Sequence, residues 1–132
     1  MMKEMKEMVC SNNGVLHNDV TAMLKTLSFM PNYNGFNYIR EAIKLAFGMD
    51  DDYSGISKTI YPEIAKRCGT TPTSVEHSIR IAISRAWKRT DDIRKLEIFG
   101  TYALHEDWKP TNSELIAVLA DKLRCEAMLK NG

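Results

Sequence analysis

The sequence lacks several features that would place it in common protein classes. No apolar run approaches the roughly 18 residues needed to cross a bilayer, so we expect no membrane-spanning helix. The start, MMKEMKEMVC, holds two glutamates and no apolar core, so we expect no secretory signal. The three cysteines, Cys10, Cys68 and Cys125, have no metal-ligand spacing and form no disulfide framework. These absences favour a reduced, cytoplasmic protein.

Catalytic patterns are missing as well. There is no glycine-rich phosphate loop, and His17, His77 and His105 lie in unrelated segments without a serine or cysteine in a nucleophile setting. The acidic run at residues 50–52 lacks the alternating ligands of a calcium loop. We therefore expect no enzyme, no metal and no cofactor.

Strand patterns and internal repeats are also absent, because no segment alternates convincingly between apolar and polar residues. Helical periodicity instead predicts an all-α fold of about six helices around one core. Besides the segment described below, helices are expected from Asn18 to Leu27, capped by His17 or Asn18, and over 36–47, 91–99 and 111–129. The last begins with a capping box, Thr111 with Glu114. Residues 1–15 are expected to form a flexible tail, or alternatively one Met-rich helical turn, before a domain at 16–130.

What the sequence does contain is a helix-turn-helix pattern at residues 59–88. Ile60, Ile64 and Ala65 give a short first helix one apolar face, Gly69 breaks that helix, and residues 70–73 form the turn. The second helix carries an inward stripe, made by Val75, Ile79, Ala82, Ile83 and Ala86. Its polar side holds Thr73, Ser74, Glu76, His77, Arg80, Ser84 and Lys88. This arrangement is typical of a helix presented to the DNA major groove.

The charge distribution supports the same interpretation. Residues 56–90 carry seven basic and two acidic side chains, a local charge of +5, although the whole chain is only +1. The rest of the chain therefore carries −4. Because phosphate neutralisation supplies most non-specific DNA affinity, the local patch matters more than the total. The alternative is a solvated helix pair in an ordinary helical domain.

Several side chains are assigned an environment from periodicity alone. We expect Cys68, Ile93, Leu96, Phe99 and Met128 to point inward, and Trp108 to pack back on the core. We expect Arg40, Glu41, Lys44 and His105 to face water, with Arg40 and Lys44 either near DNA or merely solvated. Asp91 and Asp92 suit the positive end of the dipole of the helix that they begin.

Four motifs then resemble a known family. They are GFNYIREAI at 35–43, ISKTIYPEIAK at 56–66, TTPTSVEHSIRIAISRAW at 70–87, and KPTNSE with ADKLR between 109 and 124. In this order they are similar to the effector domain of the stage-zero sporulation protein A family, over about residues 16–127. The resemblance implies a six-helix DNA-binding domain of a transcription regulator. It further implies recognition of a box with a TGTCGAA core, often as tandem dimers on double-stranded DNA.

The resemblance also implies a surface that contacts the sigma subunit of RNA polymerase, at about residues 90–103. Candidate contacts there are Asp91, Asp92, Lys95 and Glu97. Members of the family usually carry a receiver domain before the effector domain, and these 132 residues contain none. An excised effector domain and a stand-alone paralogue both remain open.

A second departure lies at the start of the recognition helix. Where the family usually has Arg-Val-Glu-Arg, this chain has Ser74, Val75, Glu76 and His77. An arginine can read guanine with two hydrogen bonds, worth ~1–3 kcal/mol of discrimination, and an imidazole can offer at most one. We expect a different preferred box or weaker affinity. Since histidine titrates near neutrality, binding is also expected to strengthen below about pH 6.5.

Helical geometry and the resemblance together predict the interface. Base-reading candidates are Thr73, Glu76, His77 and Arg80, and phosphate candidates are Lys58, Lys66, Ser74, Lys88 and Arg89. The alternative function is an interaction module that modulates a full-length regulator or a sigma subunit. Nucleoid association in the cytoplasm follows from the first interpretation.

Overall fold

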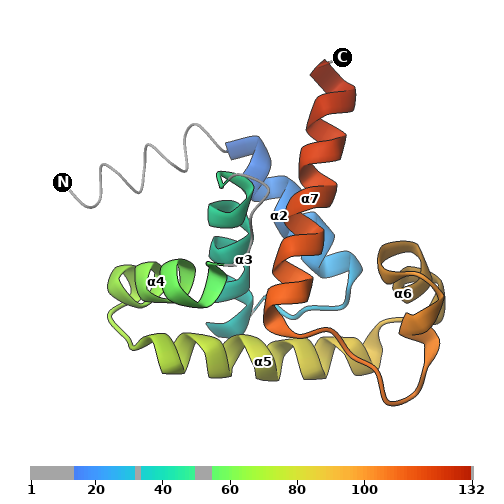
Figure 1. The fold of residues 1–132 in the computed structure, drawn as a ribbon, viewed down its shortest axis with the longest axis horizontal. Coiled ribbons are helices and arrows are strands. Elements are labelled where there is room, and N and C mark those ends of the chain that lie inside the picture. The colour runs from blue at the N-terminus through green and yellow to red at the C-terminus, as the bar shows by residue number, and fades with distance from the viewer. Residues whose placement is uncertain (1–13, 32–33, 50–54, 132) are drawn as a thin grey trace.

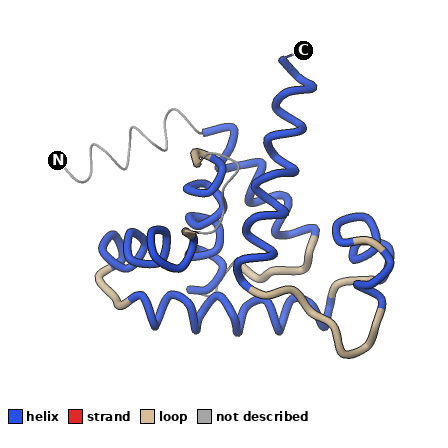
Figure 2. Tube along the Cα trace, viewed as in Figure 1, coloured by secondary structure: helices blue, strands red, loops and turns tan. Residues whose placement is uncertain are grey.

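The computed structural model describes residues 14–31, 34–49 and 55–131, and this part of the chain contains helices and loops but no strand (Figures 1 and 2). The six α-helices are α2 (Gly14–Thr26), α3 (Asn34–Phe47), α4 (Tyr61–Cys68), α5 (Pro72–Arg89), α6 (Asp92–Phe99) and α7 (Asn112–Asn131). A short π-helix, η1 (Ile56–Ile60), precedes α4, and a 3-10 helix, η2 (Thr101–Leu104), follows α6. The expected all-α fold is confirmed. Cys10 and the acidic run at 50–52 lie outside the described residues, as does most of the expected tail.

Helix α3 is the centre of the core. It contacts α2, α5 and α7, and its apolar stripe is buried against them. Figure 1 shows α3 and α7 standing on α5, with α4 near one end of α5 and α6 near the other. The predicted apolar stripes of α5 and α7 are buried as well. They include Val75, Ile79 and Ile83 of α5 and Leu115 and Leu119 of α7. Burying each such aliphatic side chain stabilises the fold by about 1.5–3 kcal/mol.

A close contact fixes α3 on α5. A Cβ added at Gly35 would collide with the backbone carbonyl oxygen of Ser78 and lie only 2.7 Å from the Cβ of Ala82. Gly35 is buried, and a side chain at this position would have no space between α3 and α5. The absence of a side chain at Gly35 therefore sets how near α3 approaches the outer helix of the motif.

Helix α2 begins further upstream than predicted. The helix begins at Gly14, so neither His17 nor Asn18 is its N-cap, and the His17 carbonyl accepts a hydrogen bond from Thr21 Oγ1 at 2.9 Å inside the helix. The prediction placed the start at the first polar residues before the apolar stripe. The stripe begins earlier, because Leu16 is also buried in the core.

The predicted exposure of α3 is wrong for its charged residues. Lys44 is 5% exposed, and its Nζ lies 3.2 Å from His17 Nδ1 and 3.3 Å from Glu41 Oε2. Glu41 and Arg40 are half-buried. Helices α2 and α4 both contact α3, and Arg67 of α4 approaches Glu41 at 3.9 Å, which encloses a side of α3 that periodicity assigned to solvent.

Apolar residues at three helix ends are exposed, contrary to prediction. Ile93 and Leu96 of α6 are 67% and 43% exposed, and Met128 of α7 is 73% exposed. Figure 1 shows the C-terminal turns of α7 extending beyond the body, and only the Phe99 end of α6 is buried. Cys68 is also exposed, because the buried face of α4 ends at Ala65. Periodicity identifies a stripe, and the neighbouring elements decide how far it is covered.

Other local predictions are confirmed. The capping box of α7 pairs Thr111 N–H with Glu114 Oε1 at 2.9 Å and Glu114 N–H with Thr111 Oγ1 at 3.1 Å. Trp108 is half-buried against the rings of Trp87, Phe99 and Tyr102. His105 is exposed, and Gly100 ends α6. None of the described helices is long and apolar enough to cross a membrane.

Candidate nucleic-acid interface

The predicted helix-turn-helix is present as α4, a short turn and α5. Gly69 takes a left-handed conformation with φ of 68°, which a residue without a Cβ adopts without strain. Thr71 then caps α5, since its Oγ1 accepts a hydrogen bond from Ser74 N–H at 3.1 Å. Pro72 occupies the first position of α5, where no N–H is needed. Thr73, predicted in the turn, belongs to the first turn of α5.

The side of α5 that faces away from the core is polar and exposed. We call it the outer face of α5 and define it by Thr73, Ser74, His77, Arg80, Ser84 and Lys88. All of these are exposed except the half-buried Ser84. The buried stripe lies opposite, so the core holds α5 by one side and leaves the other available. An 18-residue helix presented in this way has the geometry of a major-groove reader.

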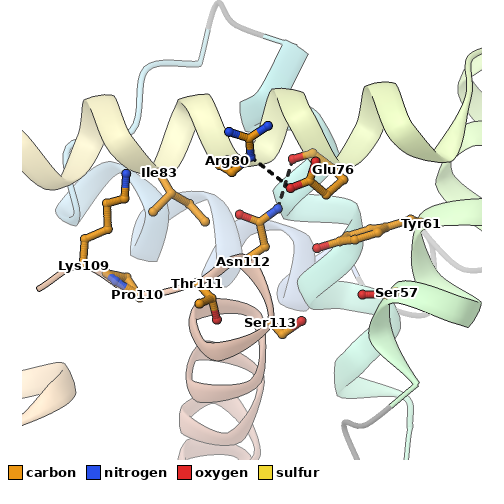
Figure 3. Close-up of a pocket in the computed structure, with 10 residues that line it drawn as sticks. All are labelled: Ser57, Tyr61, Glu76, Arg80, Ile83, Lys109, Pro110, Thr111, Asn112 and Ser113. Atoms are coloured by element: carbon orange, nitrogen blue, oxygen red, sulfur yellow. Dashed lines mark hydrogen bonds and ion pairs between the residues drawn. The ribbon is translucent and has the colours of Figure 1, made fainter.

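Arg80 contacts two of the other predicted base-reading residues, Glu76 and His77. Arg80 Nε donates to Glu76 Oε1 at 3.0 Å, and Arg80 Nη2 lies 2.9 Å from His77 Nδ1 (Figure 3 shows Arg80 with Glu76). A guanidinium only donates hydrogen bonds, so Nδ1 of His77 is the acceptor and its proton is on Nε2. Exposed ion pairs contribute about 0–1 kcal/mol, so this trio orients Arg80 more than it stabilises the fold.

The remaining predicted contacts divide between two regions. Lys58, in η1 just before the motif, and Lys66, in its first helix α4, are both exposed. Arg89, at the end of α5, is exposed and donates from Nη2 to the Ser28 carbonyl at 3.2 Å. The polymerase-contact candidates, Asp91, Asp92, Lys95 and Glu97, lie on or next to α6, beyond the C-terminal end of α5 (Figure 1). They form a region of their own and do not join the outer face of α5.

A cavity of about 350 Å³ separates α5 from the start of α7 (Figure 3). Its walls include Glu76 and Arg80 of α5, Tyr61 of α4 and the segment 109–113. Asn112 Nδ2 donates to the Glu76 carbonyl at 3.0 Å, which ties α7 to α5 across it. Burial raises the pKa of the Tyr61 hydroxyl, against the hydrogen bonds of Asn112 and Ser113, so Tyr61 remains neutral.

The segment before α7 was not predicted to take part in the interface. Lys109 Nζ lies 2.7 Å from Ser84 Oγ, on the outer face of α5. The two residues are 25 positions apart, so periodicity gave no sign of the contact. The only available signal was the position of Lys109 and Pro110 directly before the capping box of α7.

Within the described part of the chain, no group of three His, Cys, Asp or Glu side chains could hold a metal ion.

The α6 region combines charge with exposed apolar groups. Lys95 Nζ lies 4.9 Å from the ring centroid of Trp87, a cation–π distance, and so is less free than its charge suggests. Asp91 caps α6 by accepting from Arg94 N–H at 2.8 Å. Ile93, Leu96 and Tyr102 are exposed nearby. This combination is typical of a protein-contact surface more than of a nucleic-acid surface.

Comparison with protein families accounts for the fold and the motif together. The family described as sporulation initiation factor Spo0A, C-terminal, matches residues 20–123, which include all of α3 to α6 and most of α2 and α7. Domains of this family bind double-stranded DNA and regulate sporulation transcription. The resemblance noted in the sequence is thereby confirmed. The chain belongs to the family of Spo0A C-terminal DNA-binding domains.

Proposed function

We propose that this domain binds DNA by placing α5 in the major groove of a TGTCGAA-like box. The observation that carries the proposal is the outer face of α5, where Glu76 and His77 already orient Arg80. Thr73, Glu76, His77 and Arg80 would face base edges. Lys58, Lys66, Ser74, Lys88 and Arg89 would contact phosphates. The local charge of +5 in residues 56–90 supports this arrangement, because phosphate contacts supply much of the affinity.

We infer that the preferred box differs from that of the family, or is bound less tightly. The hydrogen bond from Arg80 leaves His77 with one donor, its Nε2–H, toward a base. Glu76 could accept from a cytosine amine, and Arg80 could read guanine. Protonation of His77 would end its bond with Arg80 while adding a positive charge. Acidification is therefore proposed to strengthen binding and to loosen the choice of base.

We also propose that α6 contacts the sigma subunit of RNA polymerase. Asp91, Asp92, Lys95 and Glu97 would supply the charged contacts, and the exposed Ile93 and Leu96 would add apolar area. Two copies on tandem sites would place such surfaces side by side on the promoter. Residence on the nucleoid follows from DNA binding.

A second candidate function is an interaction module that modulates a full-length regulator or a sigma subunit. The observation in its favour is the exposed apolar group on α6 and η2, formed by Ile93, Leu96, Tyr102 and Leu104. In this case DNA binding would be weak or altered. Steep salt dependence of DNA binding favours the first proposal over the second.

The test is fluorescence anisotropy of the protein with a labelled TGTCGAA duplex and a scrambled duplex, at about 50 and 200 mM salt. Tighter binding to the box at both salts is the expected result. Equal but salt-sensitive binding to both duplexes would mean altered specificity, and selection of the preferred site would follow. No binding at either salt would overturn the major-groove proposal and favour the interaction module.

A further inference from the structure

One cation on the outer face of α5 comes from outside the helix-turn-helix. Lys109 belongs to the loop between η2 and α7, yet its Nζ lies 2.7 Å from Ser84 Oγ. In Figure 3 its side chain extends from the loop toward α5. An ammonium group has three hydrogens, and one of them satisfies this contact. Among the described residues no carboxylate lies within 4.0 Å of Lys109 Nζ, so the other hydrogens face solvent.

The loop is held in place on both sides of Lys109. On one side, Trp87 Nε1 of α5 donates to the Trp108 carbonyl at 3.1 Å. On the other side, Pro110 is buried and Asn112 Nδ2 donates to the Glu76 carbonyl at 3.0 Å. Both anchors tie this segment to α5 itself. The ammonium therefore moves with the recognition helix and not with a free loop, so little order is lost when it binds.

The contact of Lys109 with Ser84 matters because Ser84 lies between two basic residues of α5. Arg80, Ser84 and Lys88 are spaced four residues apart, so they follow one another along the same edge of α5 at about 5.4 Å per turn. Arg80 and Lys88 carry positive charge, and Ser84 between them is neutral. Lys109 places an ammonium at that middle position. The result is a row of three cations along one edge of the helix, two of them from α5 and one from the loop.

We propose that Lys109 is a DNA phosphate contact, which Ser84 positions between Arg80 and Lys88. The inference rests on the proposed placement of α5 on DNA. A lysine ammonium suits this role because it contacts phosphate as a point charge, without a required fork geometry. The contact carries no base information, so its loss should weaken binding to every duplex alike.

The test measures binding to the box duplex and to a scrambled duplex as a function of salt, with the full chain. Lys109→Gln should flatten the slope of log K against log salt by about 1, since each phosphate contact contributes about −0.9. Between about 50 and 200 mM salt, this slope change makes the relative affinity loss about fourfold larger at the lower salt. Lys109→Arg should keep the slope, and Ser84→Ala should reduce affinity less than Lys109→Gln.

The matched control is Lys122→Gln, which removes the same charge from the middle of α7, where Lys122 lies 3.9 Å from Glu126 and outside the proposed interface. Lys109 is exposed, so Lys109→Gln should retain the helical circular dichroism of the parent. If the parent binds DNA with a steep salt slope and Lys109→Gln matches Lys122→Gln, the inference is overturned and the α5 proposal stands. If the parent shows no salt-dependent binding, both are overturned.

Discussion

The Arg80 guanidinium is oriented before any DNA is bound. Glu76 accepts a hydrogen bond from its Nε–H, and His77 accepts one from Nη2. The other guanidinium hydrogens remain for a base edge or a phosphate. A side chain that is already held loses less conformational freedom on binding than a free one. The choice of histidine at position 77 therefore affects Arg80 as well as the base that His77 itself would face.

His77→Arg tests this coupling directly. The variant would restore the guanidinium usual in the family, which can form two hydrogen bonds with guanine, but would place a cation next to Arg80 in place of an acceptor. We expect tighter binding and a changed base preference, by about 1–3 kcal/mol at one position of the box. Binding-site selection with parent and variant measures both. Unchanged affinity and unchanged selected sites would contradict a base-reading role for His77.

Helix α3 packs against the buried side of α5 and sets its position. Because Gly35 lies against the Ser78 carbonyl and the Ala82 side chain, the register between α3 and α5 depends on one missing Cβ. Neither contacting group is the flexible end of a long side chain. Strain introduced here would have to move one helix against the other.

We expect Gly35→Ala to destabilise the fold, because overpacking usually costs about 1–3 kcal/mol. The better helix propensity of alanine, about 1 kcal/mol, opposes this but does not exceed it. Thermal unfolding measures the change. Gly48→Ala is the control, since its added Cβ would meet only the Leu45 carbonyl, at an ordinary 3.5 Å. Equal melting temperatures for the two variants would show that α3 and α5 can separate without cost.

The helices and loops differ in how much of their structure could be predicted from the sequence alone. The stripe of α5, the Gly69 break and the Thr111–Glu114 capping box were predictable, because each depends on neighbours within a few residues. The environments of Ile93 and Lys44 were not, because they depend on where other helices lie. The same holds for Lys109, whose contact with Ser84 spans 25 positions. Local physics thus identified the recognition helix, and only the tertiary structure revealed the loop that accompanies it.

Across the protein as a whole, the polar cluster of His17, Glu41 and Lys44 joins α2 to α3 inside a mainly apolar body. Burial lowers the pKa of His17, the positive charges of Arg40 and Lys44 lower it further, and Glu41 partly opposes them. The His17 imidazole is therefore held neutral where Lys44 needs an acceptor. A group that resists protonation only in the folded state links stability to pH.

The sign of this linkage follows from the lowered pKa. The unfolded chain has an ordinary imidazole that takes up a proton near pH 6.5, while folded His17 does not until lower pH. Its contribution is therefore fully present above about pH 6.5 and is lost as the pH falls through the folded pKa. Urea unfolding from about pH 7.5 to 5.5 should show a steeper loss of stability in the parent than in His17→Gln. The glutamine keeps an acceptor for Lys44. Parallel curves would contradict this role of His17.

The contact between Trp87 and Trp108 has a practical consequence. These are the only two tryptophans of the chain, and their ring centroids lie 5.5 Å apart at the junction of α5 and the Lys109 loop. Lys109 follows Trp108 directly, so a phosphate bound by its ammonium would alter the surroundings of an indole. The protein thus carries an intrinsic fluorophore at the edge of the proposed DNA interface, and we expect its emission to report binding without an attached dye.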